Sequence, residues 1–167
     1  PRGTVLHALE VPELHGLSLG DTEFASAAAA WDALPDSLKR ALEGRRAVFD
    51  FRGRQRALTP TQEEIDRNPP VRHPIVRTHP STGRKCLYVM RDDCTGIEGM
   101  EPDEAEALIA ALADHIVKPA FVYRHQWRPG DVLMWDNCTV QHRAIQDYDM
   151  PQRRLTHRTT MGGAVPA

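Results

Sequence analysis

The feature that most constrains the fold is a run of turn and strand signals from Trp127 to Arg158. It opens with Arg128-Pro129-Gly130-Asp131, in which proline followed by glycine at the central positions favours a type II turn. The apolar run Val132–Trp135 comes next, and its valine, leucine and tryptophan favour a strand. After a polar loop, a second strand-like run ends the stretch. We therefore expect two strands joined by a long loop, with His142 near the end of the first.

Two arginines lie four residues apart in the second run. Because successive side chains of a strand alternate between its faces, Arg154, Thr156 and Arg158 are expected to point the same way. Arginine binds carboxylates through a planar two-point fork, so two guanidinium groups near His142 suit an anion held beside a metal. Surface arginines on an edge strand are the alternative, and the pattern alone leaves both interpretations open.

Five stretches of the sequence are each weakly specific alone but form a specific set. They are Gly20–Thr22 (GDT), His73–Val89 (HPIVRTHPSTGRKCLYV), Trp127–Asn137 (WRPGDVLMWDN), His142 and Arg153–Arg158 (RRLTHR). Together they span nearly the whole chain and resemble, in order and in sequence, the C-terminal part of the TauD/TfdA family of iron(II)- and 2-oxoglutarate-dependent dioxygenases.

The resemblance implies a fold, an activity and a site. The fold would be mainly β with flanking helices (α+β), a cupin-like double-stranded β-helix or jelly roll, as a single domain over residues 1–167. The activity would be hydroxylation of a small anionic substrate, such as a sulfonate or aryloxyalkanoate, using O2, Fe(II) and 2-oxoglutarate and releasing succinate and CO2. His142 would be a metal ligand, Thr22 and Arg154 would bind 2-oxoglutarate, and Arg158 would bind the substrate anion.

Thr22 has a second interpretation. The alanine-rich run Ala25–Leu34 predicts a helix, since alanine is the best helix former, and Thr22 could help to cap it. In the resembling family, the threonine of the GDT element instead gives its hydroxyl to the carboxylate of 2-oxoglutarate. We favour the ligand role because Arg154 matches the same family site.

The family's other two iron ligands have no counterpart in the sequence. Non-haem iron oxygenases use two histidines and one carboxylate, and the family takes a histidine and the carboxylate from an HxD or HxE motif upstream of GDT. None of the eight histidines has an acidic residue two positions later. We therefore expect this motif just upstream of Pro1 and a jelly roll incomplete at its N-terminus. The alternative is a remnant that does not bind iron as the family does.

Composition excludes several classes of protein. The net charge of −2 and a pI near 6.5 give no sign of nucleic-acid binding. No apolar run approaches the roughly 20 residues of a membrane helix, and no signal peptide is evident. Cys86, Cys94 and Cys138 have no CxxC spacing, which argues against disulfides and structural zinc and favours reduced thiols in a cytoplasmic protein. Whether the chain forms a homo-oligomer is left open.

The rest of the chain predicts the surrounding elements. Strands are expected at Thr4–Val11, Ala47–Phe51 and Phe121–His125, a hairpin around Ser81–Arg84, and an amphipathic helix over Met100–Val117. The polar segment 52–70 has one short helical piece, and we expect it to be a mobile loop near the active site.

Two rival functions remain. A non-catalytic jelly-roll module could bind small anions through the same arginines. Zinc-dependent hydrolysis is a weaker hypothesis, because no histidine-rich or cysteine-rich spacing supplies three ligands.

Overall fold

The computed structural model describes residues 2–53, 59–163 and 165–166. The chain divides into two compact units, and each is described by itself. Unit 1 contains Pro1–Ala27 and Lys118–Val165, and unit 2 contains Ala28–Val117 and Pro166–Ala167.

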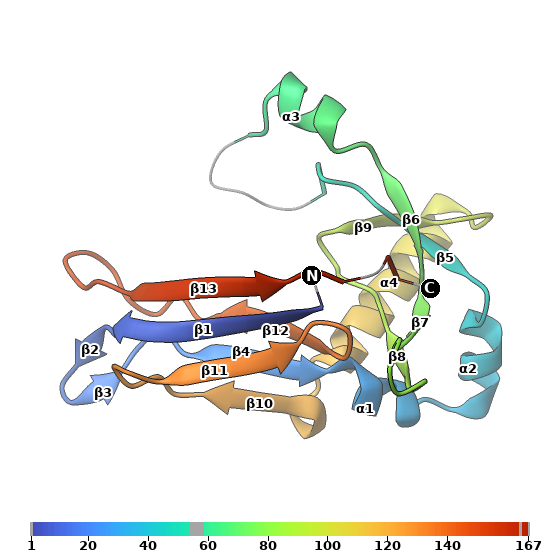
Figure 1. Cartoon of the computed structure of the whole chain (residues 1–167). Coiled ribbons are helices and arrows are strands. Elements are labelled where there is room, and N and C mark those ends of the chain that lie inside the picture. Colours follow the sequence, from blue (N-terminus) through green and yellow to red (C-terminus); the bar gives the residue numbers. More distant parts are fainter. Residues whose placement is uncertain (1, 54–58, 164, 167) are drawn as a thin grey trace. The chain divides into compact units, whose positions relative to one another are not determined.

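Unit 1 is built from two antiparallel three-stranded sheets (Figure 1). The first sheet contains, in order, β11 (Val132–Asp136), β1 (Gly3–Glu10) and β13 (Leu155–Met161). The second contains, in order, β10 (Val122–His125), β4 (Thr22–Ser26) and β12 (Val140–Ala144). The small pair β2 (Glu13–Leu14) and β3 (Leu17–Ser18) and the single-turn helix η1 (Pro119–Phe121) complete the unit.

The two sheets of unit 1 pack through their inner faces. On β1, Thr4 and Ala8 are buried, which places one face of the strand inward. Trp135 lies opposite Thr4 and is also buried. Its ring meets Phe24 of the second sheet edge-on, with 5.1 Å between the ring centroids. This contact joins the two sheets across a shared apolar layer.

Unit 2 combines the main helices with two small sheets. The three-stranded sheet contains, in order, β6 (Val71–Pro74), β5 (Arg46–Phe49) and β9 (Cys94–Ile97), and β7 (Val76–Thr78) pairs with β8 (Lys85–Leu87). The helices are α1 (Ala27–Asp32, whose first residue belongs to unit 1), α2 (Asp36–Leu42), α3 (Gln62–Arg67) and α4 (Pro102–Ile116). The predicted hairpin and the predicted long helix are both confirmed. The buried face of α4 has the expected helical spacing: Ala105, Ile109, Leu112 and Ile116.

Two local predictions are wrong. The helix expected from Ala25 begins at Ala27, and Thr22 lies in strand β4 instead of capping a helix. Hydrogen-bonded strands on both sides of β4 and the burial of Phe24 outweigh the helical propensity of alanine there. The stretch from Trp127 to Arg158 contains three strands, and the additional strand, β12, carries His142.

The expected turn before β11 agrees with the structure. Gly130 has a φ of 89°, which a type II turn requires at this position, and the Asp131 N–H donates to the Arg128 carbonyl at 3.1 Å.

Segment 52–70 is described in part, because residues 54–58 lie outside the described residues. The expected helical piece is α3, whose N-terminus is closed by a capping box between Thr61 and Glu64. Among the helices of the described residues, none is both long and apolar enough to cross a lipid bilayer.

Candidate anion and metal site on the inner face of strand β4

Strand pairing brings three candidate side chains to one face of the second sheet. Phe24 lies opposite His142 of β12, and Thr22 lies opposite Ala144. Paired residues of neighbouring strands project to the same side of a sheet, as do residues two apart on one strand. Thr22, Phe24 and His142 therefore share a face. His142 lies opposite Phe24, which is two residues further along β4 than Thr22. This is the inner face, since Phe24 contacts Trp135 of the other sheet.

The Thr22 hydroxyl is the best-connected polar group of this face. It is 2% exposed and accepts a hydrogen bond from Trp127 Nε1 at 2.9 Å. Arg154 Nη2 donates to the same oxygen at 3.3 Å, and the Arg154 guanidinium carbon lies 5.8 Å from the centroid of the Trp127 ring. Two predicted site residues, Thr22 and Arg154, are thus in direct contact, although Arg154 immediately precedes strand β13.

Gly20 makes room for this contact. Its φ of 72° lies in the left-handed region, and a Cβ there would come within 2.9 Å of Arg154 Cδ and 3.0 Å of Tyr148 Cε1. Its N–H donates to Asp147 Oδ1 at 2.7 Å, which anchors the turn that enters β4. Glycine is therefore required at the first position of the GDT element because the Arg154 side chain approaches its Cα closely.

His142 is exposed, and its ring packs against two aromatic side chains. It stacks on Phe24 with 6.1 Å between centroids, and its centroid lies 4.8 Å from that of Trp135. Partial burial, and then the positive charge of Arg158, lower the pKa of His142 below its ordinary value of 6.5. No residue of the described part of the chain is a hydrogen-bond partner of this ring, so a neutral imidazole nitrogen is available as a ligand.

Arg158 approaches the same space from the other sheet. It lies opposite Leu6, which shares a face of β1 with the buried Thr4, so its side chain leaves β13 on the inner side. Thr156 shares that face, as the alternation predicted. Arg158 is exposed, and within the described ranges no carboxylate forms an ion pair with it. After burial, its positive charge is the second cause that lowers the pKa of His142.

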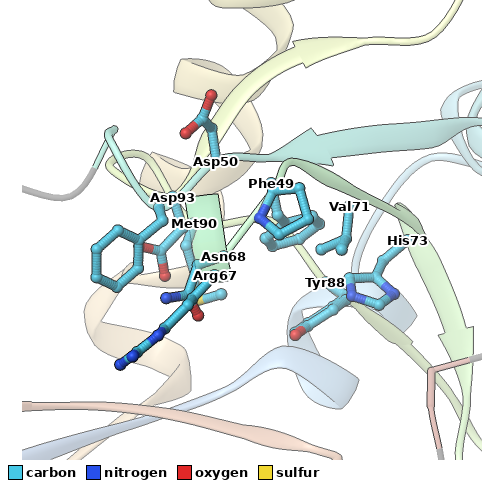
Figure 2. A pocket seen from close by; sticks show the side chains of 11 residues that line it. Phe49, Asp50, Arg67, Asn68, Val71, His73, Tyr88, Met90 and Asp93 are labelled. Atoms are coloured by element: carbon cyan, nitrogen blue, oxygen red, sulfur yellow. The ribbon is translucent and has the colours of Figure 1, made fainter. Parts of the chain in front are cut away.

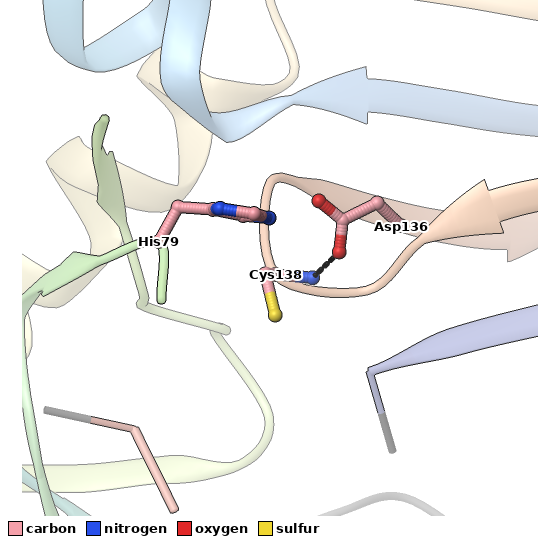
Figure 3. A group of neighbouring side chains, drawn as sticks. All are labelled: His79, Asp136 and Cys138. Carbon is pink, nitrogen blue, oxygen red and sulfur yellow. Dashed lines mark hydrogen bonds between the residues drawn. The ribbon is translucent and has the colours of Figure 1, made fainter. Parts of the chain in front are cut away.

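The turn after β11 is held by side-chain hydrogen bonds. Trp135 Nε1 donates to Asn137 Oδ1 at 2.9 Å, and Asn137 Nδ2 donates to Thr4 Oγ1 at 2.8 Å. Figure 3 shows Asp136 accepting a hydrogen bond from the Cys138 N–H, at 2.8 Å. These bonds close the turn between β11 and β12 and so fix where β12 begins.

Unit 2 contains two histidines with structural surroundings. His79 Nδ1 accepts hydrogen bonds from the backbone N–H groups of Ser81 and Thr82, at 3.2 and 3.0 Å, so this nitrogen closes a turn. His73 lines a pocket of about 530 Å³ beside the stacked rings of Phe49 and Tyr88 (Figure 2). Burial and the charges of two arginines lower the pKa of His73. The sequence did not predict this pocket, because its lining comes from several separate segments of unit 2.

Sequence reasoning also missed the part played by Trp127. In the sequence, Trp127 is only the first residue of a matching stretch, yet in the structure it is 1% exposed and its indole N–H donates to the Thr22 hydroxyl. A buried indole needs an acceptor for its N–H, and that requirement was the available signal. The partner could not be identified because it lies 105 residues earlier.

Comparison with known proteins gives consistent matches. The family model described as "Taurine catabolism dioxygenase TauD, TfdA family" matches residues 1–160. An α-ketoglutarate-dependent 2,4-dichlorophenoxyacetate dioxygenase from Burkholderia sp. (strain RASC) is 41% identical over 165 residues, covering 96% of this chain and 54% of that protein. Its counterpart from Cupriavidus pinatubonensis is 42% identical over 168 residues, covering 98% and 56%.

A solved structure matches as well. The crystal structure of AAD-2 in complex with Mn(II) and N-oxalylglycine superposes with a TM-score of 0.87 at 36% identity, covering 99% of this chain and 64% of that one. This similarity confirms the predicted jelly-roll fold. The chain spans about half the length of the curated relatives it matches. On these matches, the chain belongs to the TauD/TfdA dioxygenase family.

Proposed function

We propose that the protein acts as an Fe(II)- and 2-oxoglutarate-dependent dioxygenase that hydroxylates a small anionic organic substrate. The observation that carries the proposal is the direct contact of Arg154 with Thr22, on the sheet face that also bears His142. The arginine and the hydroxyl suit the distal carboxylate of a chelating oxoacid. The neutral imidazole beside them suits the metal that the oxoacid chelates.

The residues fit the carboxylate of 2-oxoglutarate. Arg154 is half-buried and, in the part of the chain that the structure describes, contacts a neutral hydroxyl instead of an acid. Its remaining guanidinium N–H groups can therefore bind an anion, and Thr22 adds a donor without adding a buried charge. The buried Trp127 ring lies beside Arg154, and an ion pair formed there would be strengthened by this apolar neighbour.

His142 fits one of the three protein ligands of a non-haem iron site. Its lowered pKa keeps the ring neutral at pH 7, as metal ligation requires, and Phe24 and Trp135 fix the ring plane. When bound, Fe(II) would supply oxygen activation coupled to decarboxylation of 2-oxoglutarate, yielding succinate and CO2. The chain's own contribution is to orient the ring and hold the cosubstrate.

Arg158 is proposed to bind the anionic group of the substrate. It emerges on the inner side of β13, near enough to His142 to affect its pKa, and no acid neutralises it within the described ranges. Relatives are named for 2,4-dichlorophenoxyacetate, phenoxypropionate and sulfate esters, which all carry an anionic group. We propose a substrate of this kind, a carboxylate, sulfonate or sulfate ester.

The deciding experiment measures succinate release from 2-oxoglutarate with Fe(II), O2 and a panel of such anions. We expect Fe(II)-dependent release in the unaltered protein, and its loss in His142→Ala. Binding of 2-oxoglutarate without any release would identify a non-catalytic anion-binding module. Absence of both binding and release would remove the proposal.

Three further expectations are proposed on weaker grounds. The match of one family model to residues 1–160 supports a single functional domain over residues 1–167. Three buried cysteines without CxxC spacing support a cytoplasmic setting. The role of segment 52–70 as an active-site loop is supported by its polar composition.

A further inference from the structure

We propose that Trp127 is a positioning residue that directs the hydroxyl proton of Thr22 toward the bound carboxylate. This inference rests on the proposed binding of 2-oxoglutarate by Thr22 and Arg154. It gives a buried tryptophan a defined task in recognising the cosubstrate, through an atom of Thr22 and not by contact with the ligand.

The inference begins with the hydrogen-bonding capacity of a hydroxyl group. A threonine hydroxyl has one proton to donate and two lone pairs that accept. An indole N–H and a guanidinium can only donate. The Thr22 oxygen therefore accepts from both Trp127 Nε1, at 2.9 Å, and Arg154 Nη2, at 3.3 Å. With both lone pairs engaged, the proton of Thr22 must point away from these two donors.

The proton of Thr22 then needs an acceptor. No acceptor for it is found in the described part of the chain, although the side chain is 2% exposed. A buried donor without a partner is costly, whereas a carboxylate beside Arg154 would satisfy it with a charge-assisted bond. The cluster is therefore complementary to an anion before the anion binds.

Trp127 is held firmly enough to impose this direction. It is 1% exposed, and its ring meets that of His125 edge-on, with 4.6 Å between centroids. His125 lies directly opposite Thr22 in the β10–β4 pairing. The residue that packs against the indole is therefore paired with the residue that accepts its hydrogen bond. Without its N–H, one lone pair of Thr22 would be released and the hydroxyl could rotate.

The test removes the indole N–H of Trp127 and keeps the size and shape of its ring system. The indole at position 127 is replaced by its benzothiophene isostere through site-specific incorporation of 3-benzothienylalanine, and Trp127→Phe is made in parallel. Both changes keep an aromatic face for Arg154 but lack the N–H. The same isostere at Trp31, which belongs to unit 2, is the matched control.

Equilibrium dissociation constants are measured for 2-oxoglutarate and for pyruvate, with Mn(II) present. Pyruvate has the same oxoacid end but no distal carboxylate. We expect the isostere at 127 to weaken 2-oxoglutarate binding about threefold to tenfold, the usual worth of one hydrogen bond. Pyruvate binding and the Trp31 control should not change. Added to Thr22→Val, the isostere should cause no further loss, because its effect passes through the Thr22 hydroxyl.

Three results would overturn the inference, and they are distinguishable. If Thr22→Val and Arg154→Ala weaken 2-oxoglutarate binding but the isostere at 127 does not, the positioning role fails and the proposed function stands. An equal loss for pyruvate and 2-oxoglutarate would likewise show a general structural role. If neither Thr22→Val nor Arg154→Ala affects 2-oxoglutarate, the inference and the proposed binding mode fail together.

Discussion

The arginines on the two sides of the β10–β4–β12 sheet differ in their partners. On the outer face, Arg143 of β12 forms an ion pair with Glu23 of β4 at 2.7 Å. Beside it, Arg124 of β10 pairs with the buried carboxylate of Asp21, also at 2.7 Å. Each of these guanidinium groups has a fixed carboxylate partner and a structural role.

On the inner side, no ion pair with a carboxylate is found for Arg154 or Arg158 in the part of the chain that the structure describes. Arg154 donates to the neutral hydroxyl of Thr22, and among the described residues Arg158 has no carboxylate partner. A guanidinium beside a neutral group keeps its full capacity to bind an anion, whereas one paired with a carboxylate does not. The difference shows how a site can be distinguished from a salt bridge: by which arginines the fold leaves unneutralised.

The largest effect is expected when the 2-oxoglutarate affinities of Arg154→Ala and Arg143→Ala are compared. Removing Arg154 should weaken 2-oxoglutarate binding by about 1.5–3 kcal/mol, the range for hydrogen bonds to charged groups. Titration calorimetry measures the change directly. Arg143→Ala should leave the affinity as it was, because its charge is matched by Glu23 on the opposite face. Equal effects of the two variants would erase the distinction between the faces.

Gly20→Ala sharpens the comparison by disturbing Arg154 without removing it. The new Cβ would lie 2.9 Å from Arg154 Cδ at a φ of 72°, so both strain and contact destabilise the variant, by about 1–3 kcal/mol of unfolding free energy. Gly16→Ala is the control, because Gly16 has a φ of 79° and open space around it. Urea denaturation of both separates the contact from the strain. A variant at position 20 no less stable than that at position 16 would show that Arg154 is not closely packed there.

Arg158→Ala should raise the pKa of His142, since the positive charge of Arg158 disfavours the imidazolium form. Burial is the larger cause and remains, so the pKa should stay below 6.5. NMR titration of the ring measures the shift. The same variant should weaken substrate binding while 2-oxoglutarate affinity is retained. An unchanged pKa of His142 would show that Arg158 does not lie close to this ring.

The smallest expected effect concerns stability and pH. The folded His142 ring has a lowered pKa, so the unfolded chain binds more protons as pH falls below 6.5. The free energy of unfolding should therefore decrease below that pH, until the folded pKa is passed. His142→Asn should make this decline shallower, leaving a contribution from His73, whose pKa is also lowered. Denaturation midpoints from pH 5 to 8 provide the measurement, and identical slopes would contradict a shifted His142.

Local patterns in the sequence were enough to predict the strands around Trp135, the hairpin in unit 2 and helix α4. Strand β4 was not predicted. It is stabilised by pairing with β10 and β12, about 100 residues away in the sequence, and not by its own alanine-rich composition. Thr22, His142, Arg154 and Arg158 were identified by family resemblance, and the structure brings Thr22 and Arg154 into contact. Their roles as ligands stay predictions.

The pairing of β1 has a consequence for biosynthesis. This strand is central in its sheet, and its partners are separated from it by most of the chain: Gly3 faces Asp136 on one side and Met161 on the other. Closing such distant contacts is slow. During translation, β1 must wait until β11 and β13 have left the ribosome, and until then both of its edges are open to chaperones and to other nascent chains.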